Sequence, residues 1–240
     1  TLLVQSRAFV EPVARYAGRD KIQYYPNSMN GRPPAAAAPI PHELRELLDK
    51  HFCVVFAGNL GTAQALDTLV QAAIHLRTDP QIRLVLVGSG SRLDWLKAQQ
   101  QTHGLDNLVL PGRFPTEVMP QIFEGSSALL VSLNDEEAFA QTIPSKIQAY
   151  LAAGRPIIAS MNGEGARVVC EAGAGLASPA EQVLPLVANI RSMKALGAND
   201  RAEMGRSGRQ YFEANFEMDA QVRILVQHLA FTQAGKGDRK

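Results

Sequence analysis

A glycine-rich turn is the first feature of this sequence that could bind an anion. The turn, Gly58-Asn-Leu-Gly61, follows an apolar run over 52–57 and precedes a helical pattern over 62–76. Glycines let the backbone approach a ligand closely, and a helix N-terminus offers unpaired N–H groups to an anion. We interpret the turn as a seat for a diphosphate. The alternative is a tight turn that needs glycine at positive φ.

Lys146 is the second such feature, because it is expected in the first turn of a helix, directly after Ser145. A cation there opposes the helix dipole, which favours negative groups at that end. The placement suggests a bound anion that both the lysine and the N–H groups contact. In the alternative, Lys146 points into solvent or pairs with Glu136 or Glu137, at little cost in free energy.

Three further loops follow predicted strands. Gly88-Ser-Gly90-Ser-Arg-Leu begins like the dinucleotide fingerprint G-x-G-x-x-G, but leucine stands at the third glycine position and no acidic residue ends the next strand. A dinucleotide site therefore fits poorly, and no P-loop motif occurs. Arg113 and Phe114 could sandwich a base or contact phosphate, or Phe114 is a core residue and Arg113 is solvated. The segment 162–165 is either a loop facing a sugar or phosphate, or simply a turn.

The composition of the 240 residues excludes several classes of protein. Hydrophobic residues make up 46%, which supports a sizeable core and excludes wholesale disorder. Lys and Arg number 24 against 23 Asp and Glu, a balance that argues against a nucleic-acid partner. The two cysteines, Cys53 and Cys170, exclude a disulfide scaffold and favour a reduced, cytosolic context.

Several sequence signals are absent. The five histidines show no metal-ligand spacing, so we expect no metal site, and no G-x-S-x-G motif indicates an α/β-hydrolase. No apolar run reaches the ~18 residues that span a bilayer, and no signal peptide opens the chain. Because the chain begins with Thr1 and not Met, we expect a fragment of a longer protein.

Apolar runs of strand length alternate with helical patterns along the chain. The runs cover residues 52–57, 82–87, 107–110, 128–132 and 156–159. Several are apolar nearly throughout, which is typical of strands covered on both faces in a parallel sheet. The expected fold is a doubly wound, Rossmann-like α/β sheet, whose ligands bind beyond the carboxyl ends of the strands.

Capping residues indicate where some of these helices begin and end. Ser91-Arg-Leu-Asp94 resembles a capping box that opens a helix. Pro144 suits the first turn of a helix, and Gly154 followed by Pro156 marks the end of that helix. The stretch over 133–146, after the fourth apolar run, is expected to run into this helix, with Ser145 and Lys146 in its first turn.

The first 39 residues are expected to form a unit apart from the sheet, which begins after residue 40. A strand over 2–4, a helix near 7–16 and a strand over 22–25 precede a stretch rich in proline and alanine, which is typical of a linker. The chain from residue 180 onward is mostly helical in its pattern, and its last residues are polar. We expect two domains, over 1–39 and 40–240.

The motifs together resemble the C-terminal, donor-binding half of family 4 glycosyltransferases, which have the two-domain GT-B fold. The resemblance covers about residues 50–215, and 1–27 resemble the last strand–helix–strand of the N-terminal acceptor domain. It rests on the turn at 58–61, Leu-Val-Gly-Ser-Gly90, Leu110-Pro-Gly-Arg113, the run Ile143-Pro-Ser-Lys to Ser160, Asn162-Gly-Glu-Gly165 and Glu171-Ala-Gly-Ala-Gly-Leu176. The Pro-Ser-Lys variant resembles a subgroup that acts in bacterial surface-polysaccharide assembly.

The resemblance implies transfer of a sugar, with retention at the anomeric carbon, from a UDP- or GDP-linked donor to a glycan or lipid-linked acceptor. No cofactor or obligatory metal is implied, and the reaction would take place in the cytoplasm or at the inner face of the membrane. The fragment would bind nucleotide but hardly turn over without its N-terminal domain. The residues implied for the donor site are Gly58, Asn59, Leu60, Gly61, Ile143, Ser145 and Lys146 at the phosphates, Arg113 and Phe114 at the base, and Gly88 and Gly90 in the nucleotide cleft. No catalytic residue is assigned.

The sequence departs from the family at positions that would carry charge. The usual E-x7-E pair falls at Gln141 and Ala149, where Glu136 or Glu137 would have to compensate, and the usual Arg and Lys after the first strand fall at Asn59 and Gln64. Either Lys146 and Arg113 supply the missing positive charge, or nucleotide binds weakly. Two other functions stay open, a nucleotide-sugar 2-epimerase of the same fold and a non-catalytic domain that has lost its site.

Overall fold

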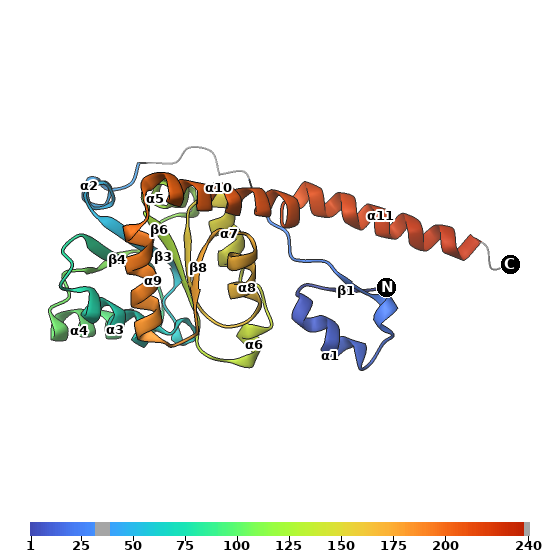
Figure 1. The fold of residues 1–240 in the computed structure, drawn as a ribbon, viewed down its shortest axis with the longest axis horizontal. Helices are drawn as coiled ribbons and strands as arrows, with labels where there is room; N and C mark the ends of the chain where they lie inside the picture. The colour runs from blue at the N-terminus through green and yellow to red at the C-terminus, as the bar shows by residue number, and fades with distance from the viewer. Residues whose placement is uncertain (32–38, 238–240) are drawn as a thin grey trace.

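The computed structural model describes residues 1–31 and 39–237, with side chains as far as Leu229. Figure 1 shows a layered body of strands and helices, with a small N-terminal unit and the long helix α11 extending to one side of it. No helix within the described ranges is long and apolar enough to cross a membrane.

Six parallel strands form the central sheet, in the order β5-β4-β3-β6-β7-β8. They are β3 (Phe52–Asn59), β4 (Ile82–Ser89), β5 (Leu108–Gly112), β6 (Ala128–Ser132), β7 (Ile157–Ser160) and β8 (Gly175–Ser178). The predicted doubly wound parallel sheet is confirmed, with β8 as a strand that the sequence pattern did not indicate. The strand order reverses between β3 and β6, and ligands bind at this switch point in sheets of this kind.

Helices cover both faces of the sheet. The helices that follow the N-terminal unit are α2 (His42–Lys50), α3 (Leu66–Leu76), α4 (Leu93–His103), α5 (Met119–Gly125), α6 (Glu137–Ala140), α7 (Ser145–Ala153), α8 (Glu164–Glu171), α9 (Val183–Ala195), α10 (Ala198–Asn215) and α11 (Met218–Gly237), of which α11 extends away from the sheet (Figure 1). Alternate strand residues point to opposite faces. Val55 and Leu129 pack on the face covered by α5, α7 and α10, whereas Val54 and Leu130 pack on the face covered by α3, α4 and α9.

The starts of three helices differ from the prediction. The predicted capping box is wrong, because α4 has Arg92 at its N-cap without a side-chain capping bond. Pro144 is the N-cap of α7, with extended backbone angles, and so lies one position before the predicted first turn. The predicted helix over 62–76 is a short 3-10 turn (Thr62–Gln64) followed by α3, because Ala65 between them adopts a left-handed conformation with φ 47°.

The N-terminal unit is the predicted strand–helix–strand. Strands β1 (Leu2–Val4) and β2 (Ile22–Tyr24) pair in parallel, with α1 (Val10–Ala14) between them. The backbone N–H of Arg7 donates to Glu164 at the start of α8, over 3.3 Å. The predicted linker lies partly outside the described residues, and the domain boundary at residue 39 stays a prediction.

Candidate functional site

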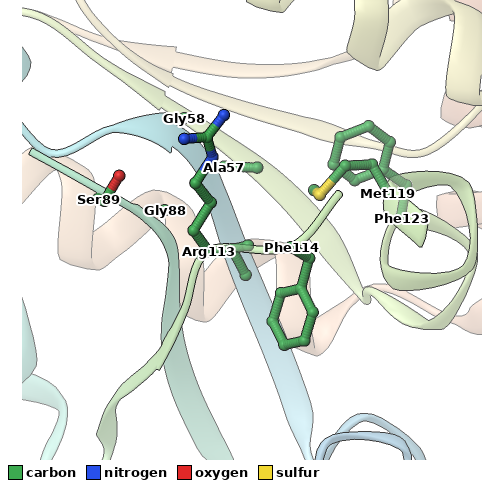
Figure 2. A pocket seen from close by; sticks show the side chains of 9 residues that line it. Ala57, Gly58, Gly88, Ser89, Arg113, Phe114, Met119 and Phe123 are labelled. Carbon is green, nitrogen blue, oxygen red and sulfur yellow. The ribbon is translucent and has the colours of Figure 1, made fainter. Parts of the chain in front are cut away.

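A cavity of about 260 Å³ opens at the carboxyl ends of β3 and β4. Its lining comes from the ends of these strands, from the loop after β5 and from α5, as Figure 2 shows. The lining residues are Ala57, Gly58, Val87, Gly88, Ser89, Arg113, Phe114, Met119 and Phe123. Four predicted residues from three separate segments therefore meet in one cavity: Gly58, Gly88, Arg113 and Phe114.

Two paired glycines form the back of this cavity. Gly58 and Gly88 lie opposite each other in the β3–β4 ladder, with φ of 142° and 146°. A Cβ on Gly88 would lie 1.8 Å from the carbonyl oxygen of Gly58, far inside van der Waals contact. Only glycine fits at position 88, and the wall that faces a ligand there is bare backbone.

Arg113 and Phe114 have different environments at the mouth of the cavity. Arg113 is exposed, and it forms no hydrogen bond or ion pair with any other described residue. Phe114 is half-buried and packs against the core on the α5 and α7 side of the sheet. The guanidinium is therefore free to meet an anion or a base, while the aromatic ring both borders the cavity and contributes to the core.

Four apolar residues and one polar residue of the cavity were not among the predicted site residues, and one of them, Ala57, belongs to β3. Met119 and Phe123 come from α5, and Val87 and Ser89 come from the end of β4. Phe123 packs edge-on against Tyr150 of α7, with ring centroids 5.4 Å apart. The helical spacing of Met119 and Phe123 is a signal that could have indicated them as the buried face of a helix.

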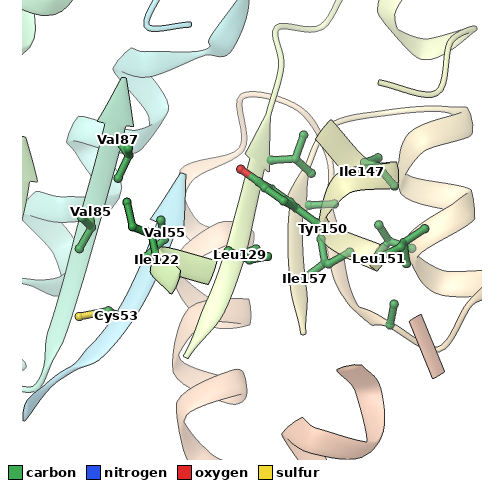
Figure 3. Close-up of a cluster of buried hydrophobic side chains, with 14 of the residues drawn as sticks. Cys53, Val55, Val85, Val87, Ile122, Leu129, Ile147, Tyr150, Leu151 and Ile157 are labelled. Carbon is green, nitrogen blue, oxygen red and sulfur yellow. The ribbon is translucent and has the colours of Figure 1, made fainter. Parts of the chain in front are cut away.

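Tyr150 connects the cavity to the core and fixes the end of β3. Figure 3 shows its side chain among the buried residues of β3, β6 and α7. Its hydroxyl accepts a hydrogen bond from the Ala57 N–H over 2.9 Å and lies 3.4 Å from the Ala57 carbonyl oxygen. The β3–β6 ladder pairs only Val54 and Val55 of β3 with β6. The Tyr150 hydroxyl therefore bonds the backbone of Ala57 at a position where β6 no longer pairs with β3.

Lys146 lies next to the cavity, on the first turn of α7. Its Nζ is 3.4 Å from the centroid of the Phe56 ring and donates a hydrogen bond to Gln64 Oε1 over 3.2 Å. A Cβ on Gly58 would lie 3.2 Å from this nitrogen, so the ammonium group adjoins the glycine wall. Burial lowers the pKa of Lys146 to about 7.

No described carboxylate pairs with Lys146, and the alternative in which it pairs with Glu136 or Glu137 is wrong for the structure. Both glutamates are exposed in or beside the short helix α6, where Glu137 accepts a hydrogen bond from Gln141. The ammonium group thus contacts only the Phe56 ring and the neutral Gln64 Oε1, and it has no carboxylate partner that would compete with a bound anion.

The start of α7 also presents backbone donors. Pro144 at the N-cap gives no side-chain cap, and the N–H groups of Ser145 and Lys146 donate to no acceptor within the described chain. Ser145 is exposed, whereas Ile143 is half-buried and packs against the core. Free N–H groups at a helix start favour an anion.

The other predicted residues of the first two glycine-rich turns do not line the cavity. The Leu60 side chain is fully buried, its N–H donates to the Ser89 carbonyl over 2.8 Å, and its carbonyl accepts from Arg92 N–H over 3.0 Å. The backbone of Leu60 is therefore occupied within the protein. Asn59 is exposed, and its side-chain amide packs against Gly61 and Gly90, within 2.7 Å of where a Cβ on either would lie.

Both polar side chains of the segment 162–165 are bonded within the protein, Glu164 as an acceptor from Arg167 and Asn162 to two neighbouring loops. Asn162 Oδ1 accepts the Ala180 N–H over 3.1 Å, and its Nδ2 donates to Asp135 Oδ1 over 2.7 Å. These bonds favour the interpretation of this segment as a turn. Ala149, which stands where the family often has a glutamate, lines a different cavity beside α5 and α7.

Comparison with known proteins agrees with this fold. The sequence matches the family described as glycosyl transferases group 1 over residues 43–211, more than half of the chain. It is 26% identical over 184 residues to WcaI of Escherichia coli (strain K12), named as a colanic acid biosynthesis glycosyl transferase, and 26% identical over 163 residues to WbjE of Pseudomonas aeruginosa, named as a glycosyltransferase. These matches cover 75% and 67% of this chain but 44% and 40% of the relatives, so the chain spans less than half of their length.

Solved structures with the same architecture support the expected GT-B relationship. The Anabaena protein Alr3699/HepE, solved in complex with UDP, superposes with a TM-score of 0.78 at 15% identity, over 95% of this chain and 63% of that one. Sucrose-phosphate synthase from Thermosynechococcus elongatus gives a TM-score of 0.74 at 20% identity, over 97% and 58% of the two chains. At these identities the likeness establishes the fold.

Proposed function

The chain belongs to the group 1 glycosyl transferase family, and on that premise we propose that it is the donor-binding part of a retaining glycosyltransferase. The donor is a sugar linked to UDP or GDP, and the acceptor is a glycan or lipid-linked glycan. The observation that carries the proposal is the unneutralised Lys146 ammonium beside the glycine wall of the cavity at the ends of β3 and β4.

The cavity suits the nucleoside end of such a donor. Its walls are the bare backbone of Gly58 and Gly88 and the apolar side chains of Phe114 and Met119, and Arg113 stands unpaired at its mouth. Largely apolar pockets with a few convergent polar groups are typical of small-molecule sites. In this proposal the base lies beside Phe114, and Arg113 contacts the base or a phosphate.

The diphosphate would then lie toward Gly58, beside the Lys146 ammonium, and we propose that it reaches the free N–H groups of Ser145 and Lys146 at the start of α7. Transfer of the sugar leaves negative charge on the departing diphosphate, and preorganised donors in a partly buried site stabilise such charge. One ammonium and two backbone N–H groups would do here what a metal ion does in other transferases. This arrangement supplies the positive charge that the neutral residues Asn59 and Gln64 lack.

Relatives support the class of substrate. The Anabaena protein is solved in complexes with UDP and with UDP-glucose, and the Escherichia coli relative is named for colanic acid biosynthesis. The chain spans less than half of the length of the Escherichia coli and Pseudomonas aeruginosa relatives. We therefore propose that transfer itself requires an N-terminal acceptor domain in addition to these 240 residues. We further propose that the reaction takes place in the cytoplasm or at the inner face of the membrane.

Calorimetric titration of the 240-residue chain with UDP, GDP, ADP and NAD tests the proposal. We expect one nucleoside diphosphate to bind and to raise the melting temperature, since a ligand that binds the native state stabilises it. Replacing Lys146 by alanine should weaken this binding about ten-fold, which is the order of one charge-assisted hydrogen bond.

The matched control is Lys97→Ala, which removes the same charge from an exposed lysine of α4 that pairs with Asp94. It should bind the nucleotide within about two-fold of the wild-type chain. A chain that responds to none of the four nucleotides at millimolar concentration would contradict the proposal, as would equal losses in the two lysine variants.

A further inference from the structure

The ends of two neighbouring strands share a sequence pattern in which the last strand residue is serine, followed by one apolar residue and then asparagine. They are Ser132-Leu-Asn134 after β6 and Ser160-Met-Asn162 after β7, and the two serines are register partners in the ladder. The asparagines thus follow equivalent positions of adjacent parallel strands. Each uses both groups of its side-chain amide to hold a neighbouring loop.

Asn134 holds the turn that follows β3. Its Oδ1 accepts the Ala65 N–H over 2.8 Å, its Nδ2 donates to the Thr62 carbonyl over 3.0 Å, and its own N–H donates to the Ala63 carbonyl over 3.0 Å. Three hydrogen bonds from one residue therefore fix the segment 62–65. Ala65 is in the left-handed region, which is unfavourable for alanine, so the local backbone needs such support.

The turn held by Asn134 carries Gln64, which is the hydrogen-bond acceptor of Lys146. The resulting chain of contacts runs from Asn134 through the turn to Gln64 and then to the ammonium beside Gly58. The links from Asn134 to the turn and from Gln64 to Lys146 are hydrogen bonds, and the ammonium lies 3.2 Å from where a Cβ on Gly58 would be. Asn134 itself does not line the cavity.

We propose that Asn134 is a positioning residue for donor binding: by holding the 62–65 turn it keeps Gln64 against Lys146 and so keeps the ammonium beside Gly58. The inference rests on the proposed function, because it assumes that a nucleoside diphosphate binds there. Asn162 provides the contrast, since neither of its partners, Ala180 and Asp135, belongs to the 62–65 turn that carries Gln64.

UDP titration of the full chain and of Asn134→Ala, Asn162→Ala and Gln64→Ala tests this role. Each asparagine variant loses two side-chain hydrogen bonds, so a comparable fall in melting temperature is expected for both. Only Asn134→Ala should weaken UDP binding, by about ten-fold, while Asn162→Ala stays within about two-fold. Gln64→Ala, whose side chain is not part of the core, should weaken binding several-fold and gives a readout even if Asn134→Ala does not fold.

A double-mutant cycle separates positioning from a general loss of stability. If Asn134 acts through Lys146, adding Asn134→Ala to a Lys146→Ala chain should change UDP affinity by less than about two-fold, because the ammonium it positions is gone. Full additivity of the two losses would overturn the inference, and so would wild-type affinity in Asn134→Ala or Gln64→Ala. A wild-type chain that binds none of UDP, GDP, ADP and NAD overturns the proposed function and this inference with it, whereas wild-type binding that the variants leave intact overturns this inference alone.

Discussion

The ammonium nitrogen of Lys146 lies 3.4 Å from the centroid of the Phe56 ring, with the ring face in place of a carboxylate partner. A cation over a ring gains about 0.5–2 kcal/mol, which is less than a buried charge loses by leaving water. Burial therefore lowers the pKa of Lys146 to about 7, even though the ring favours the charged form. A bound diphosphate would supply the negative charge that the site lacks.

Binding of UDP should accordingly depend on pH through Lys146. Below pH 7 the lysine is already charged, and above it the free protein must take up a proton to bind, because the diphosphate raises the pKa of Lys146 toward its ordinary value. Between pH 7 and the pKa of the complex, the dissociation constant should rise by up to about ten-fold per pH unit. Titrations at several pH values, in buffers of different ionisation enthalpy, measure both the affinity and the proton uptake.

Lys146→Arg is the control for this pH dependence, because a guanidinium stays charged throughout the range. Its UDP affinity should be nearly flat above pH 7, and no proton uptake should accompany binding. If UDP affinity falls equally with rising pH in the wild-type and Lys146→Arg chains, a group other than Lys146 causes the pH dependence.

The same lysine should cost the protein stability at low pH. The unfolded chain keeps the Lys146 proton up to the ordinary lysine pKa, whereas the folded chain loses it near pH 7, so the free energy of unfolding rises as pH increases through this window. Lys146→Met, which keeps an unbranched apolar stem without the charge, should therefore be more stable than the wild type at pH 6, by about 1–3 kcal/mol.

Urea unfolding of the two proteins at pH 6 and pH 9 measures that difference. The advantage of Lys146→Met should shrink at pH 9, where the folded wild-type chain no longer carries the buried charge. An advantage of the same size at both pH values would mean that packing, and not desolvation of the ammonium, is responsible.

The sheet could be predicted from the sequence because its central strands are apolar on both faces. Strand β8 could not, since its four residues include only one large apolar side chain, Leu176, and it lies at the edge of the sheet where less burial is required. The helix starts were harder still, because Arg92 and Ala65 adopt N-cap conformations that loop contacts impose and that their residue types do not favour.

The candidate site could be predicted only in part, because contacts between segments distant in the sequence decide which groups face the cavity. Glycines after predicted strands and a lysine at a predicted helix start are visible in the sequence, and four of the predicted residues line one cavity. Which backbone groups face that cavity depends on the register of β3 and β4, and this register directs the side chain of Leu60 into the core. The contacts of Asn134 with Ala65 and of Tyr150 with Ala57 join residues that are 69 and 93 positions apart in the sequence. No local sequence pattern indicates contacts over such separations.

Gly88 should be among the least replaceable residues of the fold. Its alanine variant combines an unfavourable φ of 146° with a Cβ 1.8 Å from the Gly58 carbonyl oxygen, so the β3–β4 ladder must separate at the cavity. We expect a loss of more than about 3 kcal/mol in unfolding free energy. Gly112→Ala is the control, because position 112 also has positive φ, 90°, but a Cβ there would meet nothing within 4 Å.

Urea unfolding of Gly88→Ala and Gly112→Ala thus separates contact from backbone strain. The control should lose only about 1–2 kcal/mol. Equal losses in the two variants would show that the backbone angle alone requires glycine and that the strands tolerate the added methyl group.

Tyr150→Phe tests whether the Tyr150 hydroxyl stabilises the end of β3, where it accepts the hydrogen bond of Ala57 beyond the last β3–β6 pair. The substitution removes one oxygen, keeps the ring that packs against Phe123, and leaves the N–H of Ala57 without its acceptor. An unsatisfied buried N–H costs about 1–3 kcal/mol, so the free energy of unfolding should fall by that amount. Because Ala57 lines the cavity, UDP affinity should fall as well, by about two- to five-fold. Tyr16→Phe, at a side chain that is 92% exposed, is the matched control and should change neither quantity, and unchanged stability in Tyr150→Phe would mean that the end of β3 does not depend on this hydroxyl.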